Sequence, residues 1–588
     1  MSMPLHSSSR ASSATREWLV VVAILFLVGG VAFASARQQS ITTDEIVHIP
    51  AGVTYLQLHD ARMNPEHPPL LKVFAALPLV VGGIRLDYSL PHWDRTKDAL
   101  FGEEAFSKLG PASASWILAA RVPMILVMLA LGATIFWMAR RLTDATGGFL
   151  ALLVFATTPF FYAYGSLVHT DIGIALFSLV AVWTFASFWQ DPDWPHTIRF
   201  AVCFSAALLT KFTAGLLLPT FFIVGVWLSL RHRRGILLRV LRFSMATVIA
   251  ALIVYAFYFC LFWTTDTADI LDYRFEHSVA PIPAMHKLAE FLAKHQSLKH
   301  LLSPPIIYLL GVGHTLHALP RTTYLLGTTY LHGTALYFPA LFAYKMPLGY
   351  LLLVALLVIL SALSFMRKRD YADDVLTSGP DHLRALLALF FVYTAASLAS
   401  PLNIGIRHFS VPIATLTVLL AMLVPLARNL SWPAIRRGAV AVAVVALLSS
   451  SVATVAAYPN FIPYFNSLVG KHPKFDVAID SNLDWGQGLG SLEQFHRQHP
   501  ATSLAFDLKG SVPAVYLPEG IPFNCEHGAP AGVDWAAIGA SRFVNQPESG
   551  QSTMPPPQQC RDFFSHPYQV TAGGAVYIFH LGRQEAQK

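Results

Sequence analysis

The loop after the first apolar segment holds the residues of this chain whose types and spacing could do chemistry. From Thr42 to Lys72 it reads TTDEIVHIPAGVTYLQLHDARMNPEHPPLLK, with Asp44 and Glu45 side by side near its start. A carboxylate placed there can act as a general base for a hydroxyl or amine nucleophile, or it can hold a metal ion. The alternative is a solvated acidic residue or a helix cap, because Thr43 and Asp44 precede an apolar run.

A second acidic position lies further along the chain, at the entrance of another apolar segment. Asp171 is found there in the sequence YGSLVHTDIGIALF, two residues after His169. An ionisable residue at such an entrance is costly unless it is paired or lines a wet cavity, although it can also cap its helix. We take Asp44, Glu45 and Asp171 as candidate catalytic residues and His169 as a candidate substrate-binding residue.

Basic residues collect near ends of other apolar segments. Lys211 lies in ALLTKFTA, Arg407 and His408 lie in NIGIRHFS, and Lys345 opens a later apolar segment. Such side chains bind phosphate through charge-assisted hydrogen bonds, and the alternative is that they reach the lipid head groups. For Lys211 and Arg407, which apolar sequence flanks, we favour an anion site. For Lys345 the two interpretations have equal weight.

The first loop contains three further polar candidates for substrate binding, Arg62, Glu66 and His67. For these residues metal ligation, contact with an acceptor and plain interfacial polarity are open alternatives. His48, His67, His169 and Glu66 are of types that bind divalent metals, so the question of a metal is left open.

The elements that must position these residues are apolar segments long enough to cross a membrane. Hydrophobic residues make up 54% of the chain and its mean hydropathy is +0.50, and about twenty apolar residues span a bilayer as a helix. The sequence predicts about eleven transmembrane helices, with a turn at Thr210 and Lys211 between the fifth and the sixth. The predicted spans are 18–36, 112–138, 147–165, 171–189, 199–211, 213–230, 241–264, 344–366, 383–400, 409–427 and 435–457.

Shorter apolar patterns in the first loop predict two helices that lie along the membrane interface. Ile46–Leu58 has apolar residues at helical spacing, and Pro69–Val81 is apolar but too short for a span.

Basic clusters give the expected orientation. Short loops rich in Arg and Lys remain in the cytoplasm. Such loops lie at Arg10 and Arg16, Arg140 and Arg141, Arg231 to Arg234, Arg367 to Arg369, and Arg436 and Arg437. The N-terminus is therefore expected inside, and an odd number of spans puts the C-terminal region outside. The sequence pI of about 9.1 follows from these anchors, and we expect no nucleic-acid partner.

The chain is expected to have three parts. Residues 1–17 form a cytoplasmic tail, and residues 18–457 form the transmembrane domain, with outer loops at 37–111 and 265–343. Residues 458–588 form a small α/β extracytoplasmic domain, because they mix strand-like and helix-like pieces. The pieces are Ser503–Leu508, Ala575–His580 and Gly490–Arg497, and a Pro/Gln-rich stretch from Gln546 to Gln559 is predicted to be a loose insertion.

The four cysteines fall into two classes. Cys203 and Cys260 lie within predicted spans, where they are expected to pack as small apolar residues. Cys525 and Cys560 lie in the external domain, where an oxidising compartment permits a disulfide. We predict that these two are paired.

Several short motifs together resemble a known group of enzymes. The Asp-Glu pair, NPEHPPLLK, ARVP, HTD, LLTKFTAG and NIGIRH resemble lipid-carrier-dependent glycosyltransferases of the GT-C fold. More narrowly, the chain is similar to the branch of protein O-mannosyltransferases and aminoarabinose transferases. The segments YPNFIPYFNSLVG and AIDSNLDWGQGL look like a tail shared by uncharacterised bacterial members. The resemblance extends from Trp18 to about Gln494.

The resemblance implies a polyprenyl-phosphate-linked sugar as donor, bound at the outer face of a bacterial inner membrane. Transfer is expected to invert the anomeric carbon. By position, Asp44 matches the base that engages the acceptor, Glu45 its support, and Asp171 the second acidic residue. Lys211, Lys345 and Arg407 match phosphate contacts. The acceptor is a lipid, a polysaccharide or a protein, membrane lipids surround the chain, and a divalent metal is not required in this branch.

Two alternatives accompany this interpretation. A transporter or lipid flippase with many spans is the other function class, which would place ionisable residues midway along spans and show repeated halves. Trp485, in AIDSNLDWGQGL, either stacks on a sugar or packs the C-terminal domain against the membrane part.

Overall fold

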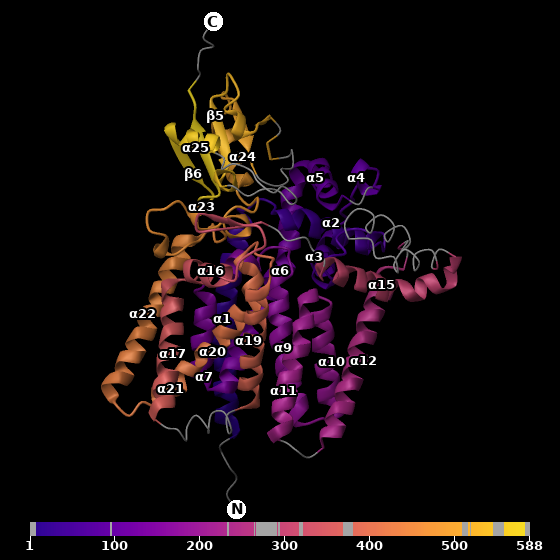
Figure 1. Cartoon of the computed structure of the whole chain (residues 1–588), viewed down its shortest axis with the longest axis vertical. Helices are drawn as coiled ribbons and strands as arrows, with labels where there is room; N and C mark the ends of the chain where they lie inside the picture. The colour runs from indigo at the N-terminus through magenta and orange to yellow at the C-terminus, as the bar shows by residue number, and fades with distance from the viewer. Residues whose placement is uncertain are drawn as a thin grey trace, which may run out of the picture.

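The computed structural model is a bundle of long helices with a small sheet at one end (Figure 1). It describes residues 7–94, 97–231, 235–263, 265, 291, 294–316, 322–367, 380–508, 516–517, 519–544 and 558–582. The C-terminal sheet lies at the end of the bundle that also carries helices α2 to α5, and the opposite end carries the start of α1 (Figure 1).

Nine helical stretches in the described ranges are long and apolar enough to cross a membrane, judged by length and composition. They are Thr15–Ala36, Asp98–Leu142, Asp171–Gln190, Phe212–Arg231, Ile236–Leu261, Leu348–Met366, Asp381–Ala399, Ile406–Arg428 and Pro433–Ala457. A tenth arises if α7 (Ala145–Ala156) and α8 (Pro159–Gly165), bent by 63°, form one broken span. The prediction of a multi-pass α-helical membrane protein is confirmed.

Single helices account for most of these stretches. They are α1 (Ser7–Ala36), α6 (Ser113–Leu142), α9 (Asp171–Gln190), α11 (Leu217–Arg231), α12 (Ile236–Leu261), α17 (Leu348–Arg367), α19 (Asp381–Ala399), α20 (Ser410–Leu419), α21 (Leu423–Arg428) and α22 (Pro433–Ala457). The short 3-10 helices η3 (Ile406–Phe409) and η4 (Leu420–Met422) continue into α20 and α21.

The fifth predicted span corresponds to α10 (Trp194–Leu208), which has only 15 residues. At 1.5 Å per residue such a helix is about 22 Å long, which is less than the apolar thickness of a bilayer. The predicted turn after it is present, because α10 ends at Leu208 and the 3-10 helix η2 begins at Phe212. Lys211 lies in this turn.

The first loop folds into short helices at the end of the bundle that carries the sheet (Figure 1). They are α2 (Thr43–Gln57), α3 (Leu70–Val81), α4 (Pro91–Asp94) and α5 (Asp98–Leu109). The two predicted helices of this loop, α2 and α3, are confirmed. They pack so closely that a Cβ on Gly52 would come within 2.1 Å of the backbone oxygen of Lys72.

Lys72 holds this loop together from inside. Its fully buried ammonium donates hydrogen bonds to Tyr55 Oη at 2.8 Å, Asn64 O at 2.7 Å and His67 O at 2.8 Å. A buried ammonium is costly without such acceptors. The side chain therefore fixes the segment from Asn64 to His67 against α2 and α3.

Much of the second predicted outer loop, 265–343, falls outside the described residues. Its described part contains α15 (Gln296–Leu316), the antiparallel strands β1 (Thr323–Leu325) and β2 (Thr328–Tyr330), and α16 (Tyr337–Lys345).

The C-terminal region forms a five-stranded sheet in the order β4-β3-β5-β7-β6. The strands are β3 (Leu504–Asp507), β4 (Ile521–Pro522), β5 (Trp535–Gly539), β6 (Tyr568–Thr571) and β7 (Val576–His580), and the helices are α23 (Lys474–Val477), α24 (Leu489–Gln498) and α25 (Gln558–Asp562). Strand β3 pairs parallel with β4 and β5, and the other pairs are antiparallel. The predicted α/β composition and its three pieces are confirmed, whereas most of the predicted insertion lies outside the described residues.

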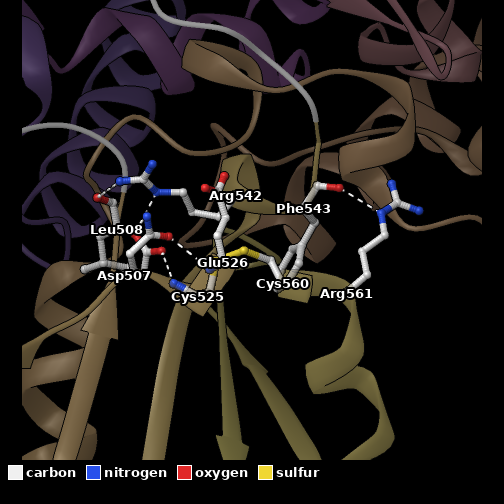
Figure 2. The surroundings of a disulfide bond; sticks show 9 residues. Asp507, Leu508, Cys525, Glu526, Arg542, Phe543, Cys560 and Arg561 are labelled. Carbon is white, nitrogen blue, oxygen red and sulfur yellow. Dashed lines mark hydrogen bonds and ion pairs between the residues drawn. A yellow bond between two sulfur atoms is a disulfide. The ribbon is translucent and has the colours of Figure 1, made fainter. Parts of the chain in front are cut away.

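The predicted disulfide between Cys525 and Cys560 is present, with 4.9 Å between the Cα atoms (Figure 2). Asp507, at the end of β3, accepts a hydrogen bond from Cys525 N at 2.8 Å. Its other oxygen lies 2.7 Å from Arg542 Nε. The disulfide thus ties the segment before β5 to α25 at the edge of the sheet.

Candidate active site

Asp44 and Glu45 lie in the first turn of α2. Glu45 also takes part in capping the N-terminus of this helix. Glu45 Oε2 accepts hydrogen bonds from Thr42 N at 2.9 Å and from Thr42 Oγ1 at 3.0 Å, an arrangement typical of a capping box. The amide of Thr43, one of those that a helix start leaves unpaired, donates to Trp485 O at 3.0 Å. The start of α2 is therefore joined to the C-terminal region.

Glu45 forms a fully buried ion pair with Arg121 of α6. Arg121 Nε donates to Glu45 Oε1 at 2.8 Å and Nη2 to Oε2 at 2.6 Å, with side-chain exposures of 1% and 0%. Val168 N also donates to Oε1, at 3.1 Å. Burial acts to raise the pKa of Glu45, but the charge of Arg121 and the hydrogen bonds to the carboxylate together outweigh burial, and the pKa lies below its ordinary value. Glu45 is thus an ionised positioning residue next to Asp44.

The rest of the Arg121 guanidinium holds the end of α1. It donates to the backbone oxygens of Ala36, Gln39 and Ser40 at 2.7, 2.8 and 2.7 Å. Arg121 therefore joins α6, the end of α1 and the start of α2 at one point.

Arg407 connects the two candidate aspartates. Its Nη1 atom donates to Asp44 Oδ2 at 2.8 Å and to Asp171 Oδ2 at 3.0 Å. The residues come from α2, from the first turn of α9 and from η3, three elements that are far apart in the sequence. The structure brings Asp44, Asp171 and Arg407 together, and the role of each stays a prediction.

Asp171 has further partners. Lys211 Nζ donates to Asp171 Oδ1. The amide of Asp171 donates to His169 Nδ1 at 3.1 Å, and the other ring nitrogen, Nε2, donates to Tyr164 O at 2.5 Å. His169 Nδ1 also lies 3.2 Å from Asp171 Oδ2. Asp171 is 1% exposed and lies in the interior of the cluster.

The segment between α23 and α24 encloses Arg407 from the other side. Arg407 Nε donates to Ser481 Oγ at 3.2 Å, and its guanidinium carbon lies 4.3 Å from the ring centroid of Trp485. Asn482 Oδ1 accepts from Ile406 N at 2.9 Å. Trp485 is only 4% exposed. Of the two predicted roles for Trp485, its contacts agree with packing of the C-terminal region against the membrane part.

Asp44 is the accessible carboxylate of the cluster, since its side chain is 23% exposed. Burial acts to raise its pKa, yet the nearby positive charges, that of Arg407 first among them, together outweigh burial, and the pKa lies below the ordinary value for aspartate. Asp44 is therefore ionised at neutral pH, the state in which a carboxylate can accept a proton.

Three imidazoles near this cluster have a buried ring nitrogen without a hydrogen-bond partner: His48 Nδ1, His67 Nδ1 and His408 Nε2. His48 lies one turn after Asp44 on α2, and its ring centroid is 5.1 Å from that of His67. Burial lowers the pKa of His48 to about 3 and holds the pKa of His67 well below its ordinary value. Both imidazoles are neutral at physiological pH.

The buried His48 predicts a loss of stability in acid. The unfolded residue has the ordinary pKa of 6.5 and the folded one about 3, so the unfolded state binds a proton first as the pH falls. The free energy of unfolding should therefore fall between pH 6.5 and pH 3, by about 2 kcal/mol at pH 5 for this residue. Between pH 7 and pH 5, we expect the unfolding free energy in detergent to fall by about 2 kcal/mol less for His48→Gln than for wild type.

The exposed His472 gives the matched control, and His472→Gln should keep the wild-type pH slope. Identical slopes for His48→Gln and wild type would show that His48 does not carry the effect.

Three predicted substrate-binding residues are engaged elsewhere. Lys345 Nζ donates to the backbone oxygens of Ile462 and Asn482, both at 2.6 Å, and burial holds its pKa well below the ordinary value for lysine. Arg62 is paired with Asp60 at 2.8 Å and lies over Trp93. Glu66 Oε1 accepts from Asn64 Nδ2 at 3.3 Å. A role of these residues in substrate binding stays a prediction that these contacts do not favour.

Among the described residues, side chains that could bind a metal ion form no cluster at the candidate site. The described residues contain one group of three or more His, Cys, Asp or Glu side chains whose ligand atoms lie within 4.8 Å of one another. It lies in the C-terminal domain and consists of Asp507, Cys525 and Cys560. Its two sulfur atoms are bonded to each other in the disulfide, so they are not thiolate ligands.

The sequence analysis assigned no role to Arg121, Ser481 or Tyr164. Tyr164 Oη donates to Ser481 O at 2.9 Å, and Ser481 Oγ donates to Ile404 O at 2.8 Å. Arg121 and Ser481 lie in motifs that carried the resemblance, ARVP and AIDSNLDWGQGL. That signal marked the segments without showing what the side chains contact.

Comparison with known proteins points in the direction of the resemblance. The family model described as "Dolichyl-phosphate-mannose-protein mannosyltransferase" matches residues 112–263, about a quarter of the chain. The matched range contains Arg121, Asp171 and Lys211. No protein with curated function matches the sequence.

Two solved structures are similar over most of the chain. ArnT from Cupriavidus metallidurans, bound to undecaprenyl phosphate, has 15% identity and a TM-score of 0.42, and the match covers 96% of this chain and 98% of that one. The oligosaccharyltransferase AglB from Archaeoglobus fulgidus, with an inhibitory peptide and a dolichol-phosphate, has 11% identity, a TM-score of 0.45, and coverages of 88% and 69%. At these TM-scores the similarity assigns no residue of this chain.

Proposed function

We propose that this chain is a membrane glycosyltransferase that transfers a sugar from a polyprenyl-phosphate donor to an acceptor nucleophile. The reaction takes place at the end of the bundle that carries α2 and the C-terminal domain, on the outer face of a bacterial inner membrane. One observation carries the proposal: an accessible ionised carboxylate, Asp44, shares a cluster with two cations suited to phosphate, Arg407 and Lys211. The family match over 112–263 supports the same class of reaction.

The proposed step is a single displacement. The acceptor oxygen or nitrogen attacks the anomeric carbon, and the bond from that carbon to the phosphate oxygen breaks. The bonding electrons leave with the polyprenyl phosphate, whose negative charge Lys211 and Arg407 stabilise. The acceptor's proton passes to Asp44, and the anomeric configuration inverts.

Arg407 couples donor binding to the strength of the base. Without donor its positive charge keeps the pKa of Asp44 low, which makes the carboxylate a weak base. The donor phosphate competes with Asp44 for the same guanidinium. When Arg407 turns to the phosphate, Asp44 loses a counter-charge, its pKa rises towards the ordinary value, and it accepts the acceptor's proton more readily.

The helix positions of the ionisable residues favour an enzyme over the transporter or flippase alternative. Asp171 opens α9, Lys211 lies between α10 and η2, and Arg407 lies in η3 before α20. A transport pathway is expected to place such residues midway along spans.

The direct test uses protein reconstituted in proteoliposomes with a polyprenyl-phosphate sugar. Release of polyprenyl phosphate together with a glycosylated product is the expected result. Mass spectrometry of envelope glycans and glycolipids, in a strain lacking the gene and in its parent, identifies the sugar and the acceptor. The proposal would be contradicted if the proteoliposomes released no polyprenyl phosphate and the two strains had the same glycans and glycolipids.

Lys211 provides a sharper test of donor binding. We expect Lys211→Met to raise the KM for the donor about tenfold or more, because a hydrogen bond between charged groups contributes about 1.5–3 kcal/mol. Lys211→Arg should restore part of the affinity. The control is Lys471→Met, which removes an exposed lysine and should leave KM unchanged. An unaltered KM in Lys211→Met would exclude the phosphate role.

A further inference from the structure

A cavity of about 570 Å³ lies at the end of the bundle opposite to the candidate active site. This size is typical of small-molecule sites. Its walls come from the ends of α6 and α9 and from the starts of α10 and α19. Ser187 on its wall follows Asp171 on the same helix by 16 residues, which corresponds to about 24 Å along the axis. The cavity is therefore separate from the Asp44 cluster.

One wall of this cavity is aromatic. The ring centroids of Trp137 and Trp183 are 5.1 Å apart, and those of Trp183 and His382 are 4.2 Å apart. His382 Nε2 lies 2.9 Å from Ser187 Oγ. Tryptophan gathers at the ends of membrane helices, where one part of the ring system meets lipid and the other meets polar groups.

Two arginines, Arg141 and Arg199, line the same cavity. The Arg141 guanidinium lies 5.7 Å from the ring centroid of Trp137. Within the described part of the chain, neither arginine has a carboxylate at ion-pair distance. Asp193, the carboxylate at the start of α10, is bonded to His196 at 2.7 Å.

Other arginines at this end of the bundle are neutralised by the protein itself. Arg140 is paired with Glu17 at 2.7 Å, and Arg384 and Arg231 are paired with Asp381 at 2.7 and 3.3 Å. Among the described residues, the two arginines in the cavity therefore differ from these neighbours in having no carboxylate at ion-pair distance, and Asp193 acts on Arg199 only from further away.

We propose that this cavity binds the phosphate group of an anionic membrane lipid from the leaflet opposite to the active site. Arg141 and Arg199 bind the phosphate oxygens, and the wall of Trp137, Trp183 and His382 packs against the apolar part beside the phosphate. A phospholipid and a polyprenyl phosphate share this chemistry, a phosphate ester on a long apolar chain. The site is independent of the proposed transfer reaction.

The test is native mass spectrometry of the full chain released from detergent micelles, with phosphatidylglycerol as the probe. The double variant Arg141→Gln/Arg199→Gln should bind phosphatidylglycerol about tenfold or more weakly than wild type. The matched control is Arg436→Gln/Arg437→Gln, two exposed arginines near the start of α22, and it should bind as wild type does. Polyprenyl phosphate and inorganic phosphate, each added as competitor, distinguish the sources of the phosphate.

Displacement of phosphatidylglycerol by polyprenyl phosphate, but not by inorganic phosphate at the same concentration, supports a lipid phosphate site. Equal binding by wild type and the double variant overturns the proposal. Displacement by inorganic phosphate alone overturns it as well, since the apolar wall would then contribute nothing.

Discussion

Asp44→Asn lowers kcat for sugar transfer by about 10²–10⁴-fold, the contribution of a positioned general base. This is the largest effect on activity that we expect from a single substitution. The amide has nearly the shape of the carboxylate and still offers an oxygen to Arg407, whose Nη1 lies 2.8 Å from Asp44 Oδ2. The unfolding temperature and the KM for the donor should therefore change much less than kcat.

The measurement is the rate of polyprenyl phosphate release by purified variants under saturating donor. Asp60→Asn is the control, because Asp60 lies in the same loop and is bonded to Arg62 at 2.8 Å, away from the cluster. It should keep wild-type kcat. Undiminished turnover by Asp44→Asn would end the assignment of Asp44 as the base.

The largest effect on stability is expected from Arg121→Met. The substitution leaves the carboxylate of Glu45, which is 0% exposed, without its counter-charge. It also removes the donors to three backbone oxygens at the end of α1. Breaking a buried ion pair on one side costs about 3–5 kcal/mol. We expect unfolding in detergent to become easier by about that amount, with loss of transfer activity because Glu45 positions the first turn of α2.

The control for this substitution is Arg140→Met, on the same helix. Its pair with Glu17 is 37% and 23% exposed on the two sides, and exposed pairs contribute at most about 1 kcal/mol. Equal destabilisation by the two variants would mean that the buried pair contributes no more to the free energy of unfolding than the exposed pair does.

Most of the helical architecture could be predicted from the sequence because membrane helices are specified locally. A run of about twenty apolar residues needs no knowledge of its neighbours. The turn before Lys211 and the helices α2 and α3 were accessible for the same reason. The strands β4, β5 and β6 of the C-terminal sheet were not predicted, since a short strand in a small mixed sheet depends on its partners.

The candidate site could be predicted only in part. Residue types and positions at the ends of apolar segments marked Asp44, Asp171 and Arg407 as candidates. A cation that is held by backbone oxygens leaves no sequence signal of its partners. Lys345 illustrates this, since its ammonium is taken by the carbonyl oxygens of Ile462 and Asn482. The pairing of Glu45 with Arg121 joins residues 76 positions apart, which a single sequence does not reveal.

The contact of Trp485 and Ser481 with Arg407 has a consequence for biosynthesis. Both residues follow α22, the last long helix of the bundle, in the chain. Arg407 therefore lacks its ring and hydroxyl partners until the ribosome has completed every membrane segment and part of the final domain. A nascent chain halted at residue 457 contains Asp44, Asp171 and Arg407 but lacks Ser481 and Trp485. On the proposed function, we expect transfer activity only after the segment that carries Ser481 and Trp485 has been synthesised and has packed on Arg407.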